Sequence, residues 1–280
     1  MTGFAEVTLT NWVTPLLLLW SIFLLDLWLG DPVYRFHPIR LIGSLLIYLE
    51  RWLFARGWNG YTGGILLGLL LLGIVLGCYF LLQKLFGSLH PVLGWSLDLF
   101  LGYSLLALRD LEIHGLRVWR ATAEGNLMAA REEISQLVGR DVERLDLAGC
   151  NRATLESLSE NLSDGVVSPL IWLTLVGIPG MLAFKVISTM DSMVGYRNSR
   201  YLRFGWFGAR ADDLMNWVPA RLTWVLLSIS AWVLPDYDGR MAWSIGLSQH
   251  QYMSGPNAGW GQAASAGALR VQLVGEKWKN

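Results

Sequence analysis

The stretch ILLGLLLLGIVLGCYFLL, residues 65–82, decides the fold class. It lies inside a longer segment, residues 57–83, that carries no charged side chain. A helix needs ~20 predominantly apolar residues to cross the hydrocarbon core of a bilayer. The length and lack of charge predict a membrane-spanning helix here and disfavour the alternative, a soluble helical core.

Four further apolar segments accompany this span. Residues 12–29 contain one charge, Asp26, and residues 92–108 contain one, Asp98. Residues 166–186 are interrupted by a Gly-Ile-Pro-Gly sequence, which predicts a turn and hence a re-entrant hairpin or a kinked span. Residues 221–234 are short for a crossing. We predict an all-α, polytopic integral membrane protein, a single domain over residues 1–280, with about four to five hydrophobic helices and interleaved cytoplasmic helices.

The composition excludes several classes of protein. Apolar residues make up 53% of the chain and charged residues 16%, which excludes intrinsic disorder. Basic and acidic residues number 22 each, so no excess of positive charge is available to neutralise a nucleic acid. Two cysteines, Cys78 and Cys150, cannot form a disulfide framework or a thiolate metal site. The arginines gather in residues 30–56, 109–152 and 185–221, a bias typical of cytoplasmic loops.

Three carboxylates recur at helical spacing in NRATLESLSENLSDG, residues 151–165. Glu156, Glu160 and Asp164 lie at i, i+4 and i+8, so a helix places them in one stripe. Like charges at this spacing repel, and a metal ion or a cationic partner relieves that repulsion. Mg²⁺ prefers carboxylate oxygens alongside substrate phosphates. The alternative is a solvated acidic face.

Two segments carry basic and hydroxyl side chains that suit anions. Residues 31–43 contain His37 and Arg40, which either bind an anionic group or belong to an interfacial loop with snorkelling basic residues. In residues 185–201, Lys185 and several hydroxyl side chains share one face of a helix. That face suits phosphate binding, and the alternative is a polar face packed against another helix.

Adjacent acids stand out in RADDLMNWVPAR, residues 210–221. Asn216 can share a helical face with either Asp212 or Asp213. Adjacent acids beside a membrane are similar to the Mg²⁺-diphosphate sites of membrane prenyltransferases. The alternative is that the acids are favoured by the dipole at a helix N-terminus. Further on, residues 254–260 predict a turn before a small-residue helix that lets backbones approach closely.

Together and in this order, these segments resemble the CobD/CbiB family, the adenosylcobinamide-phosphate synthases of cobalamin biosynthesis. The most specific blocks are DSMVGY at 191–196 and the pattern DD-x-x-N-x-x-PARL at 212–222. The other matching stretches are HPIRLIG (37–43), VGRD (138–141), ESLSENLSDGVVSPL (156–170) and PNAGW with AGALRVQL (256–273).

The resemblance implies a multi-pass enzyme of the cell inner membrane with a cytoplasmic active site. The implied reaction joins aminopropanol phosphate to a propionate carboxyl of cobyric acid as an amide. It uses ATP, and Mg²⁺ is expected with it. The implied partners are these two substrates, the lipid bilayer and membrane components of cobamide assembly, with no nucleic acid.

The resemblance also implies roles for residues in the matching blocks. Acids of these blocks carry the catalysis, and one from the acidic stripe deprotonates the incoming ammonium: Glu156, Glu160, Asp164, Asp191 and Asp213. The metal and phosphates are held by Asp164, Asp191, Asp212 and Asp213. Substrates are bound by His37, Arg40, Lys185, Ser192, Tyr196, Arg197, Arg210, Asn216, Arg221 and Asn257.

The chain departs from the family pattern at two positions near its last block. Met253 stands where the family usually has His, and Gln262 where it usually has Glu. These departures motivate an alternative, a catalytically impaired paralogue that acts as a membrane component of cobamide assembly. A prenyl-type membrane transferase that uses Asp212, Asp213 and Asn216 is a further alternative.

Overall fold

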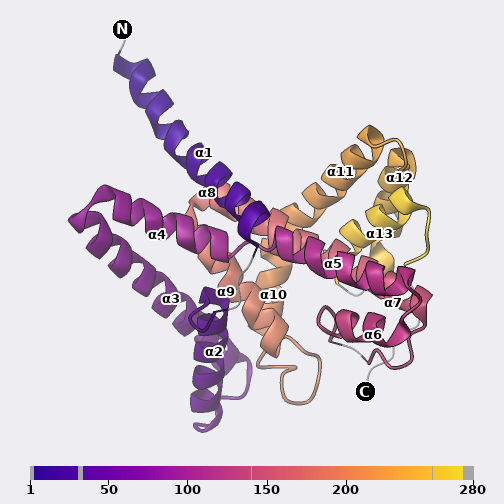
Figure 1. Ribbon diagram of the computed structural model, residues 1–280. Coiled ribbons are helices and arrows are strands. Elements are labelled where there is room, and N and C mark those ends of the chain that lie inside the picture. The colour runs from indigo at the N-terminus through magenta and orange to yellow at the C-terminus, as the bar shows by residue number, and fades with distance from the viewer. Residues whose placement is uncertain (1–2, 31–33, 140, 254, 274–280) are drawn as a thin grey trace. The chain divides into compact units, whose positions relative to one another are not determined.

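A computed structural model describes residues 3–30, 34–139, 141–253 and 255–273, and within these ranges it contains helices and no strand. The all-α prediction is therefore confirmed (Figure 1). The chain divides into two compact units, each built from two separate stretches. The first comprises Met1–Ala107 and Ser168–Met215, and the second Leu108–Val167 and Asn216–Asn280. The single domain over residues 1–280 stays a prediction.

The first unit is a set of seven helices within the described residues. They are α1 (Gly3–Leu29), α2 (Pro38–Phe54), α3 (Tyr61–Leu89), α4 (Pro91–Ser104), α8 (Ser168–Val176), α9 (Ile178–Val194) and α10 (Trp206–Met215). Helix α3 packs against α2, α4, α9 and α10. The hydrophobic core of the first unit includes five fully buried residues: Leu46, Leu67, Leu71, Met190 and Phe204. The amphipathic spacing of apolar residues on α2 explains why this helix turns one face to that core.

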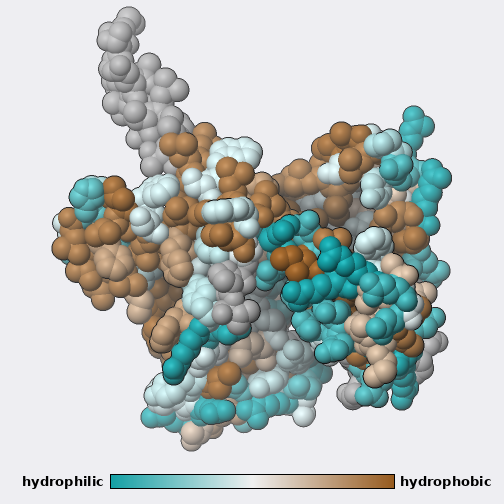
Figure 2. All heavy atoms as spheres, in the orientation of Figure 1, coloured by the Kyte–Doolittle hydropathy of each residue, from teal (hydrophilic) through white to brown (hydrophobic). Residues whose placement is uncertain are grey.

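Helices α3 and α4 arise from the apolar segments predicted at residues 57–83 and 92–108, and they pack against each other as a hairpin. His90 ends α3, and its Nδ1 accepts a hydrogen bond from the Val92 backbone N–H at the start of α4, where Pro91 favours helix initiation. The charge of Asp98 is satisfied inside the hairpin, since its carboxylate accepts bonds from the Tyr79 hydroxyl (3.0 Å) and the Gln83 amide (2.9 Å). Figure 2 shows hydrophobic side chains over this hairpin.

Among the described residues, two helical stretches are long and apolar enough to cross a membrane: Tyr61–Leu89, and Pro91–Ala123, which contains α4 and α5. Pro15–Leu29 and Trp217–Val233 are apolar but shorter. A polytopic membrane protein is consistent with these helices, and the count of four to five stays a prediction. The expected break after residue 176 is confirmed, because Gly177 has φ of 76° and separates α8 from α9, which pack against each other.

The second unit gathers the remaining helices of the described residues. They are α5 (Leu108–Ala123), α6 (Leu127–Ser135), α7 (Leu147–Leu162), the π-helix η1 (Ser163–Val167), α11 (Trp217–Val233), α12 (Gly239–Gln249), the 3₁₀-helix η2 (His250–Tyr252) and α13 (Ala258–Leu269). Asn126 caps α6 through a bond from the Ala129 N–H. Helix α13 is rich in small residues and packs closely against α7, α11 and α12, as its composition predicted.

Both cysteines are free, and Cys78 is exposed whereas Cys150 is buried.

Candidate functional site

A cavity of about 420 Å³ lies in the first unit where α9 ends and α10 begins. We call it the first-unit cavity. Its lining includes residues from two of the blocks identified in the sequence, DSMVGY at 191–196 and RADDLMNWVPAR at 210–221. Its lining residues are Tyr61, Gly195, Tyr196, Arg197, Tyr201, Leu202, Gly205, Trp206, Ala209, Arg210 and Asp213.

The close approach of two backbones forms the base of this cavity. Helix α9 ends at Gly195, whose N–H donates to the Asp191 carbonyl at 2.7 Å. Gly205 then passes directly against the Val194 carbonyl, where a side-chain carbon would have no room. The chain therefore returns from the 196–205 loop into α10 beside the end of α9, and α9 and α10 pack side by side.

Opposite charges meet in the first-unit cavity. Arg197 and Arg210 contribute cationic side chains, and Arg210 Nη1 lies 3.3 Å from a carboxylate oxygen of Asp213. Asp191 lies one turn before Gly195 on α9. Burial raises the pKa of its carboxyl, and the charge of Asp213 raises it further. The carboxylates of Asp191 and Asp213 thus influence each other across the ends of α9 and α10.

This pair of carboxylates determines what the site can hold. Within the described ranges, no group of three or more His, Cys, Asp or Glu side chains is gathered closely enough to hold a metal ion. Mg²⁺ does not need such a group, because it usually binds through one or two carboxylates, waters and substrate phosphates. Asp191 and Asp213, beside two arginines, fit that mode of binding.

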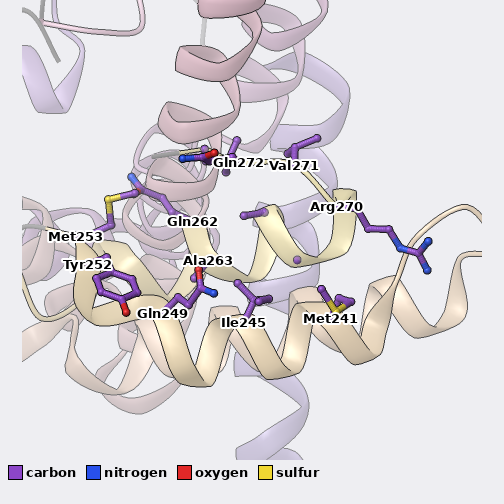
Figure 3. Close-up of a pocket in the computed structure, with 13 residues that line it drawn as sticks. Met241, Ile245, Gln249, Tyr252, Met253, Gln262, Ala263, Arg270, Val271 and Gln272 are labelled. Carbon is purple, nitrogen blue, oxygen red and sulfur yellow. The ribbon is translucent and has the colours of Figure 1, made fainter. Parts of the chain in front are cut away.

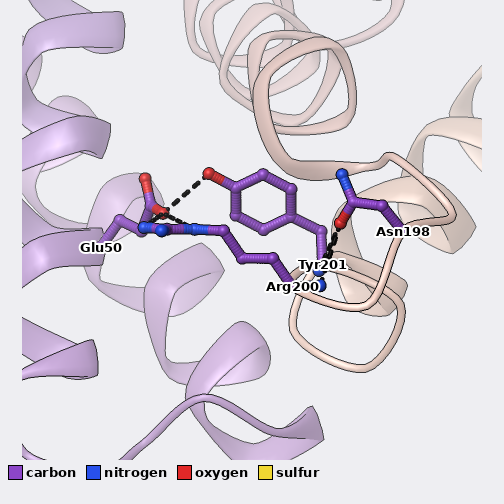
Figure 4. Close-up of polar contacts among 4 residues, drawn as sticks. All are labelled: Glu50, Asn198, Arg200 and Tyr201. Carbon is purple, nitrogen blue, oxygen red and sulfur yellow. Dashed lines mark hydrogen bonds and ion pairs between the residues drawn. The ribbon is translucent and has the colours of Figure 1, made fainter.

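A buried glutamate on α2 fixes the loop that closes the cavity (Figure 4). One carboxylate oxygen of Glu50 accepts bonds from Arg200 Nη2 at 2.8 Å and from the Tyr201 hydroxyl at 2.9 Å. The Asn198 side chain accepts bonds from the Arg200 and Tyr201 N–H groups and shapes the turn between them. Burial, and then the bond to Glu50, raises the pKa of Tyr201, so its phenol remains a donor at neutral pH.

Replacing Glu50 by Gln is expected to lower the melting temperature of the detergent-solubilised protein. The amide keeps the shape but loses the charge that binds Arg200, which costs about 1–2 kcal/mol of unfolding free energy. Thermal unfolding followed by circular dichroism measures the change. Glu124→Gln, at an exposed position of the second unit, is the matched control and is expected to be neutral. Equal melting temperatures for the two variants would count against this role of Glu50.

The structure places five other predicted residues of the first unit outside the lining of this cavity, and Asp191 is not part of that lining either. His37 is buried and caps α2, since its Nδ1 accepts the Ile39 N–H, whereas Arg40 is exposed on the first turn of the same helix. Lys185 is buried two turns before Asp191, and the Ser192 hydroxyl donates to the Thr189 carbonyl. Asp212, next to Asp213, is partly exposed and does not line the cavity.

The acidic stripe belongs to the second unit. Glu156 is buried and Glu160 is exposed on α7, while Asp164 lies in η1, where the π-helical turn changes the helical register. Gln262 of α13 binds this stripe, because its Nε2 donates to a Glu160 carboxylate oxygen at 3.2 Å and to the Glu156 carbonyl at 3.4 Å. The acidic stripe on α7 is therefore hydrogen-bonded to the side-chain amide of a residue on α13, which is distant in sequence.

The other predicted residues of the second unit lie at the starts of helices. Asn216 is buried directly before α11, and Asn257 directly precedes α13. The Arg221 guanidinium lies 4.1 Å from the Trp217 ring centroid and 5.0 Å from that of Trp260. This cation–π arrangement fixes Arg221 between α11 and α13.

Sequence reasoning missed Glu50, Arg200 and Tyr201. A signal for Glu50 was present, because it falls on the same helical face as Leu46, Leu49 and Leu53, where a lone acid needs a partner.

Comparisons with known proteins support a single family. The profile of the family described as CobD/Cbib protein matches residues 19–279. A cobalamin biosynthesis protein CobD of Yersinia enterocolitica is 42% identical over 256 residues, covering 90% of this chain and 80% of its own length. The corresponding CobD of Geobacter metallireducens is 44% identical over 252 residues, covering 90% and 79%. A cobalamin biosynthesis protein CbiB of Salmonella choleraesuis is 37% identical over 265 residues, covering 93% and 82%. No solved structure matches the chain.

Proposed function

The chain belongs to the CobD/CbiB protein family, and from this premise we propose that it is the amide-forming ligase of cobalamin biosynthesis that makes adenosylcobinamide phosphate. Its substrates are aminopropanol phosphate, ATP and cobyric acid, which must already carry the adenosyl group that appears in this product. The curated relatives are named for cobalamin biosynthesis, and this supports the pathway for the present chain. The candidate spans Tyr61–Leu89 and Pro91–Ala123 support a multi-pass location in the cell inner membrane, with the basic segments and the active site on the cytoplasmic side.

The observation that carries this proposal is the mixture of charges in the first-unit cavity. A carboxylate and an ammonium do not condense at neutral pH without activation of the carboxylate. Transfer of the γ-phosphoryl group of ATP to the propionate forms an acyl phosphate and releases ADP. The amine nitrogen then attacks the carbonyl carbon, and inorganic phosphate leaves. Such chemistry needs positioning and neutralisation of phosphate charge more than it needs a reactive side chain.

The residues of the cavity can supply that neutralisation. Arg197 and Arg210 of the lining can bind phosphate oxygens. Asp213 of the lining, together with Asp191, whose carboxyl feels the charge of Asp213, would hold Mg²⁺. When bound, Mg²⁺ would supply positive charge that offsets the charge of the phosphates. The incoming ammonium must also lose a proton before its nitrogen can attack, and a carboxylate side chain can accept that proton. Tyr61 and Trp206 lie edge to face at 5.8 Å and give the cavity an aromatic wall.

Two alternatives remain tied to particular residues. A non-catalytic component of cobamide assembly is favoured by Met253 and by Gln262, whose neutral amide already occupies the Glu160 carboxylate. The prenyl-type transferase rests on Asp212, Asp213 and Asn216, and the family to which the chain belongs favours the ligase over it.

A turnover assay on detergent-purified protein tests the proposal. Cobyric acid, aminopropanol phosphate, ATP and Mg²⁺ are supplied, and the amide product is sought by mass. We expect product that depends on both ATP and the amine. Corrinoid binding without product would support the non-catalytic alternative, and neither binding nor product would refute the ligase.

A further inference from the structure

A second cavity, of about 380 Å³, lies wholly in the second unit between α12, α13 and the segment that follows α13 (Figure 3). We call it the second-unit cavity. Met241, Ile245 and Gln249 project from one face of α12 toward α13, as their spacing of four residues requires. Ala263 and Val271 add further apolar surface. No residue of the first-unit cavity contributes to this lining.

Gln262 contributes to the wall of this cavity, and its side chain carries a buried acceptor. The residue is 3% exposed, and its Nε2 donates to the Glu160 carboxylate and the Glu156 carbonyl. Both of these partners can only accept, so the NH₂ group must face them and the orientation of the amide is fixed. Its Oε1 is buried and has no hydrogen-bond partner in the described part of the chain. A buried acceptor left in this state is costly, which makes it a position for a donor from a ligand.

The charges of the side chains that line the cavity indicate whether the ligand group that donates this hydrogen bond is charged or neutral. Arg270 is the cationic side chain of the described lining, and two of its nitrogens bind the Asp238 carboxylate, at 2.7 and 3.1 Å. Arg270 is therefore committed to Asp238, which also caps α12 through the Met241 N–H. The remaining polar groups are neutral, chiefly the carboxamides of Gln249, Gln262 and Gln272. An anion or an ammonium ion would gain little binding free energy in this cavity, because it would lose its hydration and find no free opposite charge among the described lining residues. A neutral hydrogen-bond donor attached to an apolar group suits the neutral amides and apolar side chains of the lining.

We propose that the second-unit cavity binds a neutral carboxamide carried at the edge of an apolar ring system, with its N–H donated to Gln262 Oε1. The proposal rests on the ligase function, under which the ligand is a peripheral side-chain amide of the corrinoid substrate. A cavity of this size accommodates a drug-sized fragment and not a whole macrocycle, so it recognises one edge of the ring. Gln262, which departs from the family pattern, is thus a specificity residue in this chain.

Binding measured by quenching of tryptophan fluorescence tests the proposal with two corrinoids. One is cobyric acid, and the other is its counterpart with carboxylic acids in place of the side-chain amides. We expect the wild-type protein to prefer the amide form about tenfold, the effect of one buried hydrogen bond. Gln262→Leu removes the acceptor and is expected to abolish the preference. Ala266→Leu fills the cavity while leaving the bonds of Gln262 in place, and it is expected to weaken binding of the amide form to a similar extent.

Gln251→Leu is the matched control, since Gln251 is exposed and lies outside the lining. It is expected to keep both the preference and the turnover. The proposal is overturned if Gln262→Leu and Ala266→Leu both bind the amide form with the wild-type preference over the acid form, while their melting temperatures show that they are folded. That result leaves the ligase function intact. A wild-type protein that turns over no substrate and binds neither corrinoid overturns the ligase function, and this proposal with it.

Discussion

Asp213→Asn and Asp191→Asn are each expected to lower kcat for amide formation by at least about 100-fold while the protein remains folded. The substitutions keep the size of the side chain but remove the charge that, under the proposed function, would hold Mg²⁺ beside the phosphates. Loss of one preorganised electrostatic contact at a developing charge typically costs this much. Turnover by mass and melting temperature in detergent are measured together.

The matched control for these variants is Asp236→Asn, at an exposed position of the second unit. It removes one carboxylate charge away from the first-unit cavity and is expected to leave turnover unchanged. Full activity in either Asp191→Asn or Asp213→Asn would remove that residue from the mechanism.

The raised pKa of Asp191 adds a consequence for stability with a definite sign. The pKa of Asp191 is higher in the folded protein than in the unfolded chain, chiefly through burial and then through the charge of Asp213. Below the unfolded pKa the group is protonated in both states and has no effect on stability. Above the folded pKa its ionisation disfavours folding in full. At neutral pH, Asp191→Asn should therefore melt at a higher temperature than the wild-type protein, although it is inactive.

A variant that is more stable but inactive identifies a residue that serves function and not stability. A carboxylate that served only to stabilise the fold would lower the melting temperature when replaced. A lower melting temperature for Asp191→Asn at neutral pH would contradict the placement of its charge. The raised pKa also predicts that turnover falls as the pH drops through the titration of Asp191, because the site needs the ionised form.

The sequence predicted those parts of the fold and site that depend on local order. The apolar stretch at 65–82 predicted α3, and Gly177 predicted the break between α8 and α9. Tyr196, Arg197, Arg210 and Asp213 line one cavity because their blocks lie directly after α9 and along α10, which are joined by a loop. The family resemblance had placed these residues, which are near one another in sequence, in one candidate site.

Contacts between distant segments could not be predicted in this way. Glu50 binds residues 150 positions away, and Gln262 binds Glu160 at a separation of 102. Helical periodicity states which face a residue occupies, but it does not state which other helix covers that face. His37 illustrates the same limit, because its chemistry suggested an anion site, whereas its Nδ1 caps the helix that follows it. Capping is decided by backbone geometry that the residue type alone does not reveal.

Gly205→Ala is expected to disrupt the first-unit cavity and to destabilise the protein by about 2–3 kcal/mol, the cost typical of overpacking. The cause is contact and not backbone strain. The added carbon would overlap the Val194 carbonyl and lie 3.1 Å from the Gly195 Cα, so the ends of α9 and α10 must separate. Their separation moves the carboxylates of Asp191 and Asp213 apart, and turnover should fall with stability.

Gly73→Ala provides the matched control for this substitution. Gly73 lies on α3 with no atom within 4 Å of an added carbon, so the change should be neutral or slightly stabilising through helix propensity. Melting temperature and turnover distinguish the two positions. If Gly205→Ala melted and turned over like Gly73→Ala, α9 and α10 could not meet as closely as the structure has them, and the cavity that brings Arg197, Arg210 and Asp213 together would lose its base.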